Sequence, residues 1–245
     1  MPVSHRLEVN FFLTRRKVVS AKSFYILLAG LAALVAYVWV KDSYSLSLQF
    51  FLFLFPHVFL FISQDMMMDE IETGVLENVA FARGAFRNYL FEKNIYLFLM
   101  ALAVALAAFS LLAAYGLASG QFSARFLLQF LMGVAAGAYY ISLGGFLSFY
   151  FKGGSNVLVV IIGQLSAFIG LLFSATERLG FIDQLTAASF PDWSSRLKFI
   201  VFLGVLPNIL ASQKYFAGSL GIGALTCFFL MLQRMKIGAL ELKKR

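Results

Sequence analysis

The chain has 245 residues, of which 61% are hydrophobic and only 13% are charged, and its mean hydropathy is +0.84. A soluble domain carries about 25% charged residues, so this composition excludes an ordinary water-soluble protein and predicts an integral membrane protein. The net charge of +8 is therefore interpreted as a signal of membrane topology, not of nucleic-acid binding.

The N-terminal segment, residues 1–22, is rich in basic residues. It does not resemble a cleavable signal peptide, because the first apolar run begins only after Lys22 and lacks a small-residue cleavage pattern. We expect this segment to lie in the cytoplasm, either as an interfacial helix or as a simple basic anchor before the first span.

Windows without Asp, Glu, Lys or Arg predict six transmembrane helices, because a bilayer needs about 20 apolar residues per helix. The predicted spans are residues 23–40, 43–64, 94–115, 126–151, 153–176 and 215–233. The third uncharged window continues to residue 124, so we expect a loop near 115–120. A shorter uncharged window, 199–213, contains Pro207 and predicts a re-entrant or interfacial segment. The fold class is therefore all-α, with the whole chain forming one polytopic transmembrane domain.

The distribution of basic residues predicts the orientation of this domain. Six spans place both termini on the same side of the membrane, and fourteen of the 20 Lys and Arg residues then fall on that side. The positive-inside rule assigns that side to the cytoplasm. The loop 65–93 and the tail 234–245 are thus predicted to be cytoplasmic, and 177–214 is the longest external segment.

Two of the polar residues inside the predicted spans, His57 and Gln164, are candidates for a polar pathway. His57 follows Pro56 in the second span, where proline predicts a kinked helix, and Gln164 lies in the fifth. Each of them either forms a hydrogen bond to a neighbouring helix or lines a polar pathway through the membrane. Both alternatives remain open for His57 and Gln164.

Small residues at helical spacing occur in the fourth predicted span. Gly133 and Gly137 form an i, i+4 pair, which lets two helix backbones approach closely. This approach takes place either within one subunit or at a dimer interface.

An acidic segment, residues 69–77, separates the second and third predicted spans and carries four carboxylates. Read as a helix, it places Ile71, Val75 and Leu76 on one side and most of its glutamates elsewhere. Such a helix can dock into a groove on another protein. The alternative is a solvated helix that packs on its own membrane domain.

Several kinds of site are missing from the sequence. There is no G-x-x-x-x-G-K-[ST] phosphate loop, and the two histidines, His5 and His57, belong to no metal-ligand or Ser-His-Asp motif. The predicted spans also lack the charged residues that proton-driven pumps usually keep within the membrane. We therefore expect no catalytic, cofactor or metal site in this chain, and any energy for uphill transport must come from a partner.

From Glu70 to Lys93 the chain reads EIETGVLENVAFARGAFRNYLFEK. This stretch resembles the E-x-E-x-G-T-hydrophobic-E element that permeases of the ABC-2 exporter family carry after their second span. The positions that match in register are Glu70, Glu72, Gly74, Leu76, Glu77 and the final Lys93. Three positions depart from the pattern: Val75, Arg83 and Glu92 stand where Thr, Pro and Gly are frequent.

The resemblance implies that the chain is the membrane subunit of an ATP-binding cassette exporter. The membrane that the resemblance leads us to expect is a bacterial inner membrane. A coupling helix would dock on a separate ATPase subunit that binds ATP and Mg²⁺, and its residues would be Glu70, Ile71, Glu72, Gly74, Val75, Leu76 and Glu77. A second permease copy or a homologous permease would complete the transporter. The cargo would be amphipathic, lipid-like, or a peptide or drug.

Two other functions stay open at this point. One is a non-transporting membrane scaffold or an accessory permease-like subunit, and the other is a membrane-embedded enzyme. The enzyme would need acids, histidines or metal ligands near the membrane, and the carboxylates of residues 65–77 are the only cluster of that kind in the sequence.

Overall fold

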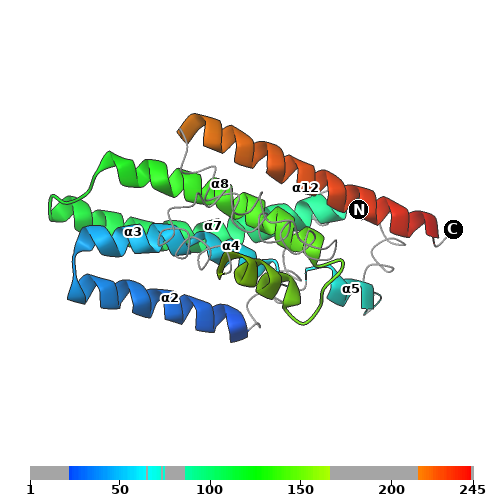
Figure 1. Ribbon diagram of the computed structural model, residues 1–245, viewed down its shortest axis with the longest axis horizontal. Helices are drawn as coiled ribbons and strands as arrows, with labels where there is room; N and C mark the ends of the chain where they lie inside the picture. Colours follow the sequence, from blue (N-terminus) through cyan, green and yellow to red (C-terminus); the bar gives the residue numbers. More distant parts are fainter. Residues whose placement is uncertain (1–21, 65, 73, 75–85, 166–214, 244–245) are drawn as a thin grey trace, which may run out of the picture.

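The computed structural model describes residues 22–64, 66–72, 74, 86–165 and 215–243. Regular structure in these ranges is helical throughout, with no strand among them, which confirms the predicted all-α class. The helices are α2 (Lys22–Lys41), α3 (Tyr44–Leu54), α4 (Pro56–Ile62), α5 (Met68–Glu72), α7 (Phe86–Ala118), α8 (Ala124–Leu147), α12 (Tyr215–Lys243) and the unlabelled Ser155–Leu165. Figure 1 shows the long helices running lengthwise, with α5 at the end of the bundle where α12 ends.

Four helical segments in the described part of the chain are long and apolar enough to cross a membrane. They are Tyr44–Ile62, Tyr89–Ala118, Ala124–Leu147 and Gly218–Ile237. Their length and composition are those of a membrane protein. The first and fifth predicted spans correspond to the shorter apolar helices Tyr25–Lys41 and Ser155–Leu165, so the count of six spans stays a prediction.

The ends of three helices differ from the predicted spans. Helix α7 begins at Phe86, so residues 86–93 belong to a helix and not to the predicted loop 65–93. Helix α8 ends at Leu147 and not at residue 151, and α12 continues through most of the predicted tail to Lys243. Uncharged windows mark only the part of a helix that fits the hydrocarbon layer, and a helix with charged residues can continue beyond that layer.

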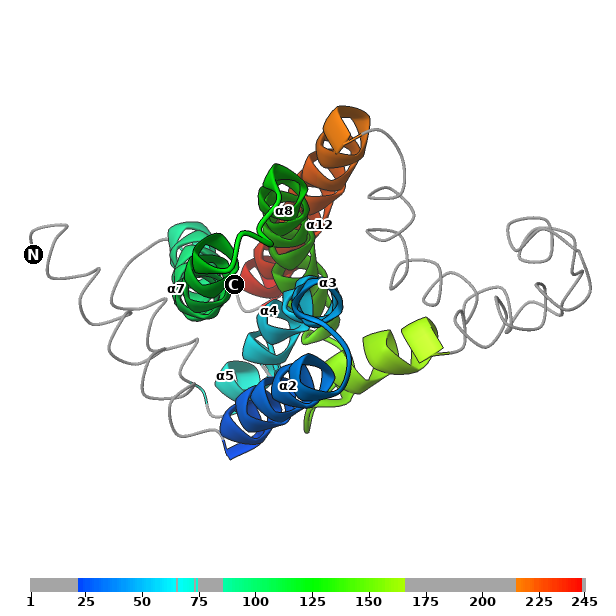
Figure 2. The same ribbon diagram turned by 90° about the vertical axis from the view of Figure 1, so that its left-hand side faces the viewer.

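The second predicted span consists of two helices, α3 and α4, separated by Phe55. Pro56 begins α4, because proline has no backbone N–H and fits the first turn of a helix. Phe55 itself keeps helical φ and ψ angles, so the structure shows an interruption of the helix at Pro56, and the kink stays a prediction. Figure 2 shows α3 and α4 in the middle of the bundle, with α2, α7 and α8 around them.

Glycines on α8 let the α3–α4 segment pack closely against it. A Cβ atom at Gly133 would lie 2.4 Å from the Phe55 ring, and one at Gly137 would lie 2.6 Å from the Phe59 ring. Both rings are fully buried. The Gly133/Gly137 pair therefore serves packing within the subunit, which was one of its two predicted roles.

Some predicted features lie outside the described residues. They are the basic N-terminal segment up to residue 21, the end of the acidic segment (Val75, Leu76 and Glu77), the external segment 177–214 and the uncharged window 199–213.

Candidate functional site

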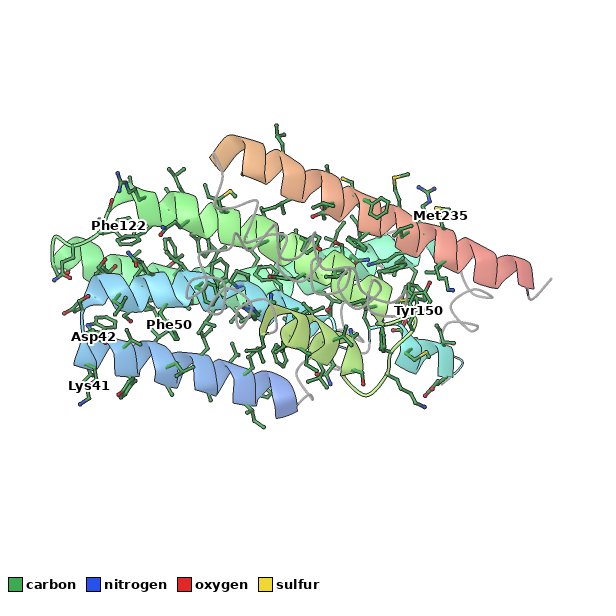
Figure 3. The ribbon with its side chains drawn as sticks, in the orientation of Figure 1. Lys41, Asp42, Phe50, Phe122, Tyr150 and Met235 are labelled. Atoms are coloured by element: carbon green, nitrogen blue, oxygen red, sulfur yellow. The ribbon has the colours of Figure 1, made fainter. Side chains whose placement is uncertain are left out.

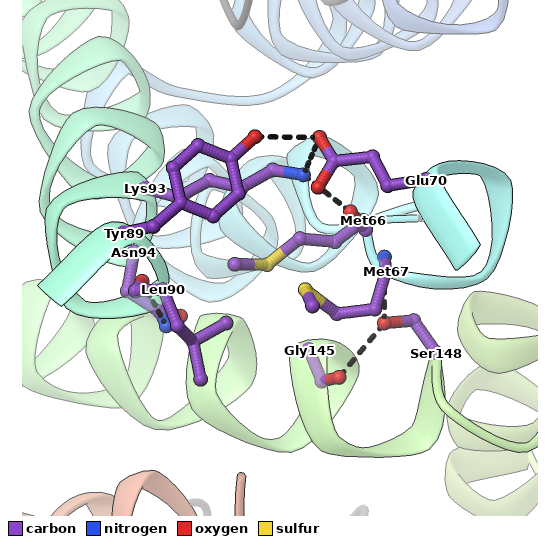
Figure 4. Close-up of polar contacts among 9 residues, drawn as sticks. All are labelled: Met66, Met67, Glu70, Tyr89, Leu90, Lys93, Asn94, Gly145 and Ser148. Carbon is purple, nitrogen blue, oxygen red and sulfur yellow. Dashed lines mark hydrogen bonds and ion pairs between the residues drawn. The ribbon is translucent and has the colours of Figure 1, made fainter. Parts of the chain in front are cut away.

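The chain turns sharply between α4 and α5, at the end of the bundle. Helix α4 ends at Ile62 and is capped by Ser63, whose N–H donates to the Leu60 carbonyl, and the following Met66 and Met67 are buried. The Met67 N–H donates to the Ser148 hydroxyl at 3.2 Å, and Ser148 donates to the Gly145 carbonyl at 2.7 Å (Figure 4). The entry to α5 is thus fixed to the end of α8.

A buried ion pair joins α5 to α7. The Lys93 ammonium lies 2.5 Å from Glu70 Oε1, and the two side chains are only 3% and 14% exposed. Lys93 also donates to the Met66 carbonyl, and the Tyr89 hydroxyl donates to the same Glu70 oxygen at 2.9 Å (Figure 4). Breaking a buried pair by removing one partner costs about 3–5 kcal/mol, because the other charge stays buried without compensation.

One oxygen of this cluster is unsatisfied. Glu70 Oε2 is buried and accepts no hydrogen bond from the described residues. A buried carboxylate oxygen without a hydrogen-bond donor lowers the stability of the fold. The hydrogen bonds that Lys93 and Tyr89 donate to the other oxygen of Glu70 are therefore needed to keep this carboxylate buried.

A second ion pair joins α5 to the loop after α8. Lys152 Nζ lies 3.0 Å from Glu72 Oε1, with side-chain exposures of 67% and 50%. An exposed pair of this kind contributes about 0–1 kcal/mol and weakens with salt. Glu72 therefore remains accessible to another cationic group.

Helix α5 is shorter than the helix expected over residues 69–77. It ends at Glu72, and Gly74 has φ 70, a left-handed conformation outside the helical region. A single amphipathic helix through Gly74 is therefore wrong. Glycine adopts this conformation at little cost, so Gly74 lets the chain turn after α5.

The described part of the acidic segment faces its own membrane domain more than expected. Glu70 points to Lys93, and Ile71 packs against the buried apolar core. Glu72 is exposed, and a Cβ atom at Gly74 would meet no other atom within 4 Å. Of the predicted coupling residues described, Glu72 and Gly74 are the two that present an open surface.

A buried amide network lies below this cluster. Asn94 Nδ2 on α7 donates to Gln233 Oε1 on α12 at 2.9 Å, and Gln233 Nε2 donates to the Ser142 carbonyl on α8 at 2.6 Å. A Cβ atom at Gly145 would lie 2.7 Å from Gln233 Nε2, so glycine makes room for the amide. The network fastens three long helices to each other near the level of α5.

Asn156 extends these polar contacts to the helix Ser155–Leu165. Its Nδ2 donates to the carbonyls of Ser63 and Gly144, each at 3.1 Å. The end of α4, the end of α8 and the start of the next helix therefore meet at one buried side chain.

Several residues of this site are not identified by the sequence analysis, namely Tyr89, Asn94, Ser148, Asn156 and Gln233. A sequence signal exists for part of this site. Lys93 directly precedes the long uncharged window, and an ionisable residue at such a place needs a partner within the protein. The amides Asn94 and Gln233 likewise lie where apolar runs begin or end.

The two candidate pathway residues, His57 and Gln164, are in direct contact. His57 Nε2 lies 2.9 Å from Gln164 Oε1, and Gln164 Nε2 lies 2.7 Å from the Tyr140 hydroxyl. His57 Nδ1 is 3.0 Å from the Leu54 carbonyl. The interhelical hydrogen bond predicted as one alternative for both residues is therefore confirmed, and the pathway stays a prediction.

Two proton arrangements satisfy this chain of contacts. Because the Leu54 carbonyl can only accept, His57 Nδ1 carries a proton. A doubly protonated imidazole would then donate from Nε2 to Gln164 Oε1, with the amide N–H₂ directed at Tyr140. A neutral imidazole would accept at Nε2 from the amide N–H₂, with the Tyr140 hydroxyl donating to Oε1.

Within the described residues, no group of three or more His, Cys, Asp or Glu side chains is placed to hold a metal ion. Comparisons of the chain with protein-family models, with curated proteins and with solved structures find no match. Any assignment of function therefore has to come from the residues and from their arrangement.

Proposed function

We propose that the chain is the membrane-spanning permease subunit of an ATP-binding cassette exporter, driven by a separate ATPase subunit that docks on the acidic segment 69–77. The observation that carries the proposal is the attachment of α5 to two long helices. Glu70 is paired with Lys93 on α7, and the Met67 N–H is bonded to Ser148 next to α8. The similarity of residues 70–93 to the ABC-2 permease element supports the same proposal.

This attachment suits a helix that transmits force. A push on α5 would reach α7 through a buried ion pair, which resists separation far more than an exposed one. It would reach α8 through the Ser148 hydroxyl, and α8 in turn packs against α4 and α12. Movement of a docked ATPase would thus displace several membrane helices together, because α5 is attached to them by these contacts.

The geometry supports a smaller set of proposed contacts with the ATPase. Since Glu70 and Ile71 are occupied within the subunit, the docking contacts are assigned to Glu72, Gly74 and residues 75–77. Glu72 would exchange its exposed Lys152 for a basic residue of the ATPase, at little cost to the permease. Glu70 then holds the segment in place and makes no contact with the partner.

The rest of the proposal follows the family resemblance. The termini and the acidic segment are cytoplasmic, the membrane is a bacterial inner membrane, and a second permease copy or homologue completes the assembly. ATP and Mg²⁺ belong to the ATPase. The cargo is amphipathic, lipid-like, or a peptide or drug.

Co-purification with the ATPase encoded beside this chain tests the proposal. We expect wild type to form a complex that hydrolyses ATP, and Gly74→Trp and Glu72→Lys to abolish that complex. Trp at residue 74 projects into open space where the ATPase would sit. Glu72→Lys reverses the charge that meets the basic cleft.

Matched controls exist at the other end of the bundle. Gly120 has φ 68 and open space around its Cβ position, just as Gly74 has, so Gly120→Trp introduces the same backbone strain elsewhere. Asp42→Lys is the corresponding reversal of an exposed acid. Both controls should keep the complex. Equal loss in Gly74→Trp and Gly120→Trp, or a complex that survives every variant, would refute docking at the acidic segment.

Glu70 and Glu72 each form an ion pair with a lysine of the same chain. These internal ion pairs also favour a second function, that of a non-transporting scaffold or accessory subunit. In that case the acidic segment serves only to close its own membrane domain. No ATPase complex would form with wild type, while Lys93 variants would still destabilise the protein.

A further inference from the structure

An apolar groove runs along the side of the bundle between α2 and α7. Its volume is about 350 Å³, within the range of about 300–1,000 Å³ that is usual for small-molecule sites. The walls come from α2 and α7, and the floor comes from Phe51, Phe55 and Val58 of the α3–α4 segment. Every lining residue is apolar, which excludes a charged or strongly polar ligand.

The walls of the groove are formed in part by small residues. Ala32 and Ala36 on α2 are exposed, and Ala105 and Ala108 on α7 face the same space. Short side chains on both walls keep the two helices from filling the gap with their own atoms. The groove opens beside the large exposed apolar side chains of the same helices, such as Leu34 and Leu106, so it is continuous with the surface that faces lipid in a membrane helix bundle.

The length of the groove matches one leaflet of a bilayer. On α2 it extends from Leu28 to Trp39, which at about 1.5 Å per residue is about 16 Å. The hydrocarbon core of a bilayer is about 30 Å thick, so one leaflet occupies about half of it. A single acyl chain has that reach, whereas a helix of a partner would be expected to cross both leaflets.

Aromatic residues mark the headgroup end. The Trp39 ring lies 4.5 Å from the Tyr115 ring and 5.8 Å from the Tyr44 ring, between centroids. Clusters of Trp and Tyr prefer the level at which acyl chains meet headgroups. Just beyond them, Lys41 and Asp42 are exposed at the end of α2, where Figure 3 shows both, and they offer one charge of each sign to a zwitterionic headgroup.

We propose that this groove binds one acyl chain of a membrane phospholipid, with its headgroup beside Lys41 and Asp42 and its methyl end near Leu28. The acyl chain enters the groove sideways from the bilayer, between α2 and α7. This binding does not depend on an ATPase partner, so it can hold or fail independently of the transport function proposed above.

The test counts phospholipids retained by the full chain. The protein is placed in nanodiscs of palmitoyl-oleoyl phosphatidylethanolamine and phosphatidylglycerol, extracted in mild detergent, and weighed intact by native mass spectrometry. We expect wild type to retain one phospholipid per chain. Ala36→Phe fills the groove with a ring and should lower the retained fraction by about tenfold, since the ring takes the apolar surface that the acyl chain would cover.

Ala33 provides the matched control. It is exposed on the same helix one turn from Ala36 but does not line the groove, so Ala33→Phe should retain lipid as wild type does. Ala32→Phe fills the groove at a second place and replaces Ala36→Phe if that variant does not give a monodisperse protein. The proposal is overturned by a wild type without bound lipid or by equal losses in Ala33→Phe and Ala36→Phe. It is also overturned if Ala36→Phe turns a dimer into a monomer at unchanged lipid content, because the groove would then hold a second copy of the chain.

Discussion

Lys93 on α7 holds the carboxylate of Glu70 on α5 at 2.5 Å, one residue before a stretch without any charged residue that extends to residue 124. The ammonium is buried at the end of a membrane-spanning helix, where it has Glu70 and the Met66 carbonyl as acceptors. This relationship decides how the acidic segment sits on the membrane domain, because α5 has only five residues and a helix that short is not stable on its own.

Loss of the lysine should therefore destabilise the whole protein. Lys93→Met leaves Glu70 buried without a cation, and we expect a loss of about 3–5 kcal/mol. The thermal unfolding of the purified protein in detergent measures it. In Lys93→Met with Glu70→Leu no charge is left unpaired, so most of the stability should return.

The exposed pair supplies the comparison. Lys152→Met removes an ion pair that is open to solvent, and its effect should stay below about 1 kcal/mol. A double variant at Glu70 and Lys93 that unfolds as easily as Lys93→Met alone would show that the pair is not the source of the loss.

The packing of α8 against α4 gives a second prediction. Gly137→Ala places a methyl group 2.6 Å from the buried ring of Phe59, and overpacking of this kind costs about 1–3 kcal/mol. Gly30→Ala on α2 is the control, because its Cβ position has no atom within 4 Å and alanine is the better helix former. Unfolding measurements should show a lower midpoint for Gly137→Ala and an unchanged or higher one for Gly30→Ala. Equal behaviour of the two variants would contradict close contact between α4 and α8.

Much of the helical architecture can be predicted from the sequence, because it depends on local properties. Four of the six predicted spans coincide with helical segments that are long and apolar enough to cross a membrane, and Pro56 predicts the break between α3 and α4. The Gly133/Gly137 pair predicts a close helix contact. Each of these follows from the composition of one segment, whatever the rest of the chain does.

Features that depend on contacts between distant segments could not be predicted in the same way. The end of α5 at Glu72 depends on Gly74 turning left-handed while Ile71 packs onto the core, and the pairing of Asn94 with Gln233 joins residues 139 positions apart. A helical pattern over residues 69–77 is compatible with several such arrangements. The partners of His57 were likewise open, because the sequence does not say which helix lies next to it.

The hydrogen bonds of Gln164 can separate its two predicted roles. Gln164→Leu removes the bonds to His57 and Tyr140, and interhelical bonds of this kind are worth about 0.6 kcal/mol each, with a maximum near 1.7. If Gln164 serves only packing, the variant should lower the unfolding midpoint slightly and leave the proposed transport activity per folded molecule unchanged.

Tyr140→Phe is the companion variant, since it keeps the buried ring and removes only the hydroxyl. The double variant with Gln164→Leu should cost less than the sum of the two single changes, because both remove the same bond. A loss of transport at normal stability in Gln164→Leu would instead favour the polar pathway.

The orientation of the bundle can be tested with two exposed positions at opposite ends. Asp42 lies at the end of α2, and Lys152 lies beside Glu72 and has a side chain that is 67% exposed. In a Cys227→Ala background, Asp42→Cys should react with a membrane-impermeant maleimide in intact cells. Lys152→Cys should react only after the cells are opened, because the positive-inside rule places its end of the bundle in the cytoplasm. The lost Glu72 contact is an exposed ion pair, so the substitution should leave the fold intact. The reverse pattern of labelling would place α5 outside the cell, where no ATP-hydrolysing subunit could reach it, and the proposed transport function would fail with it.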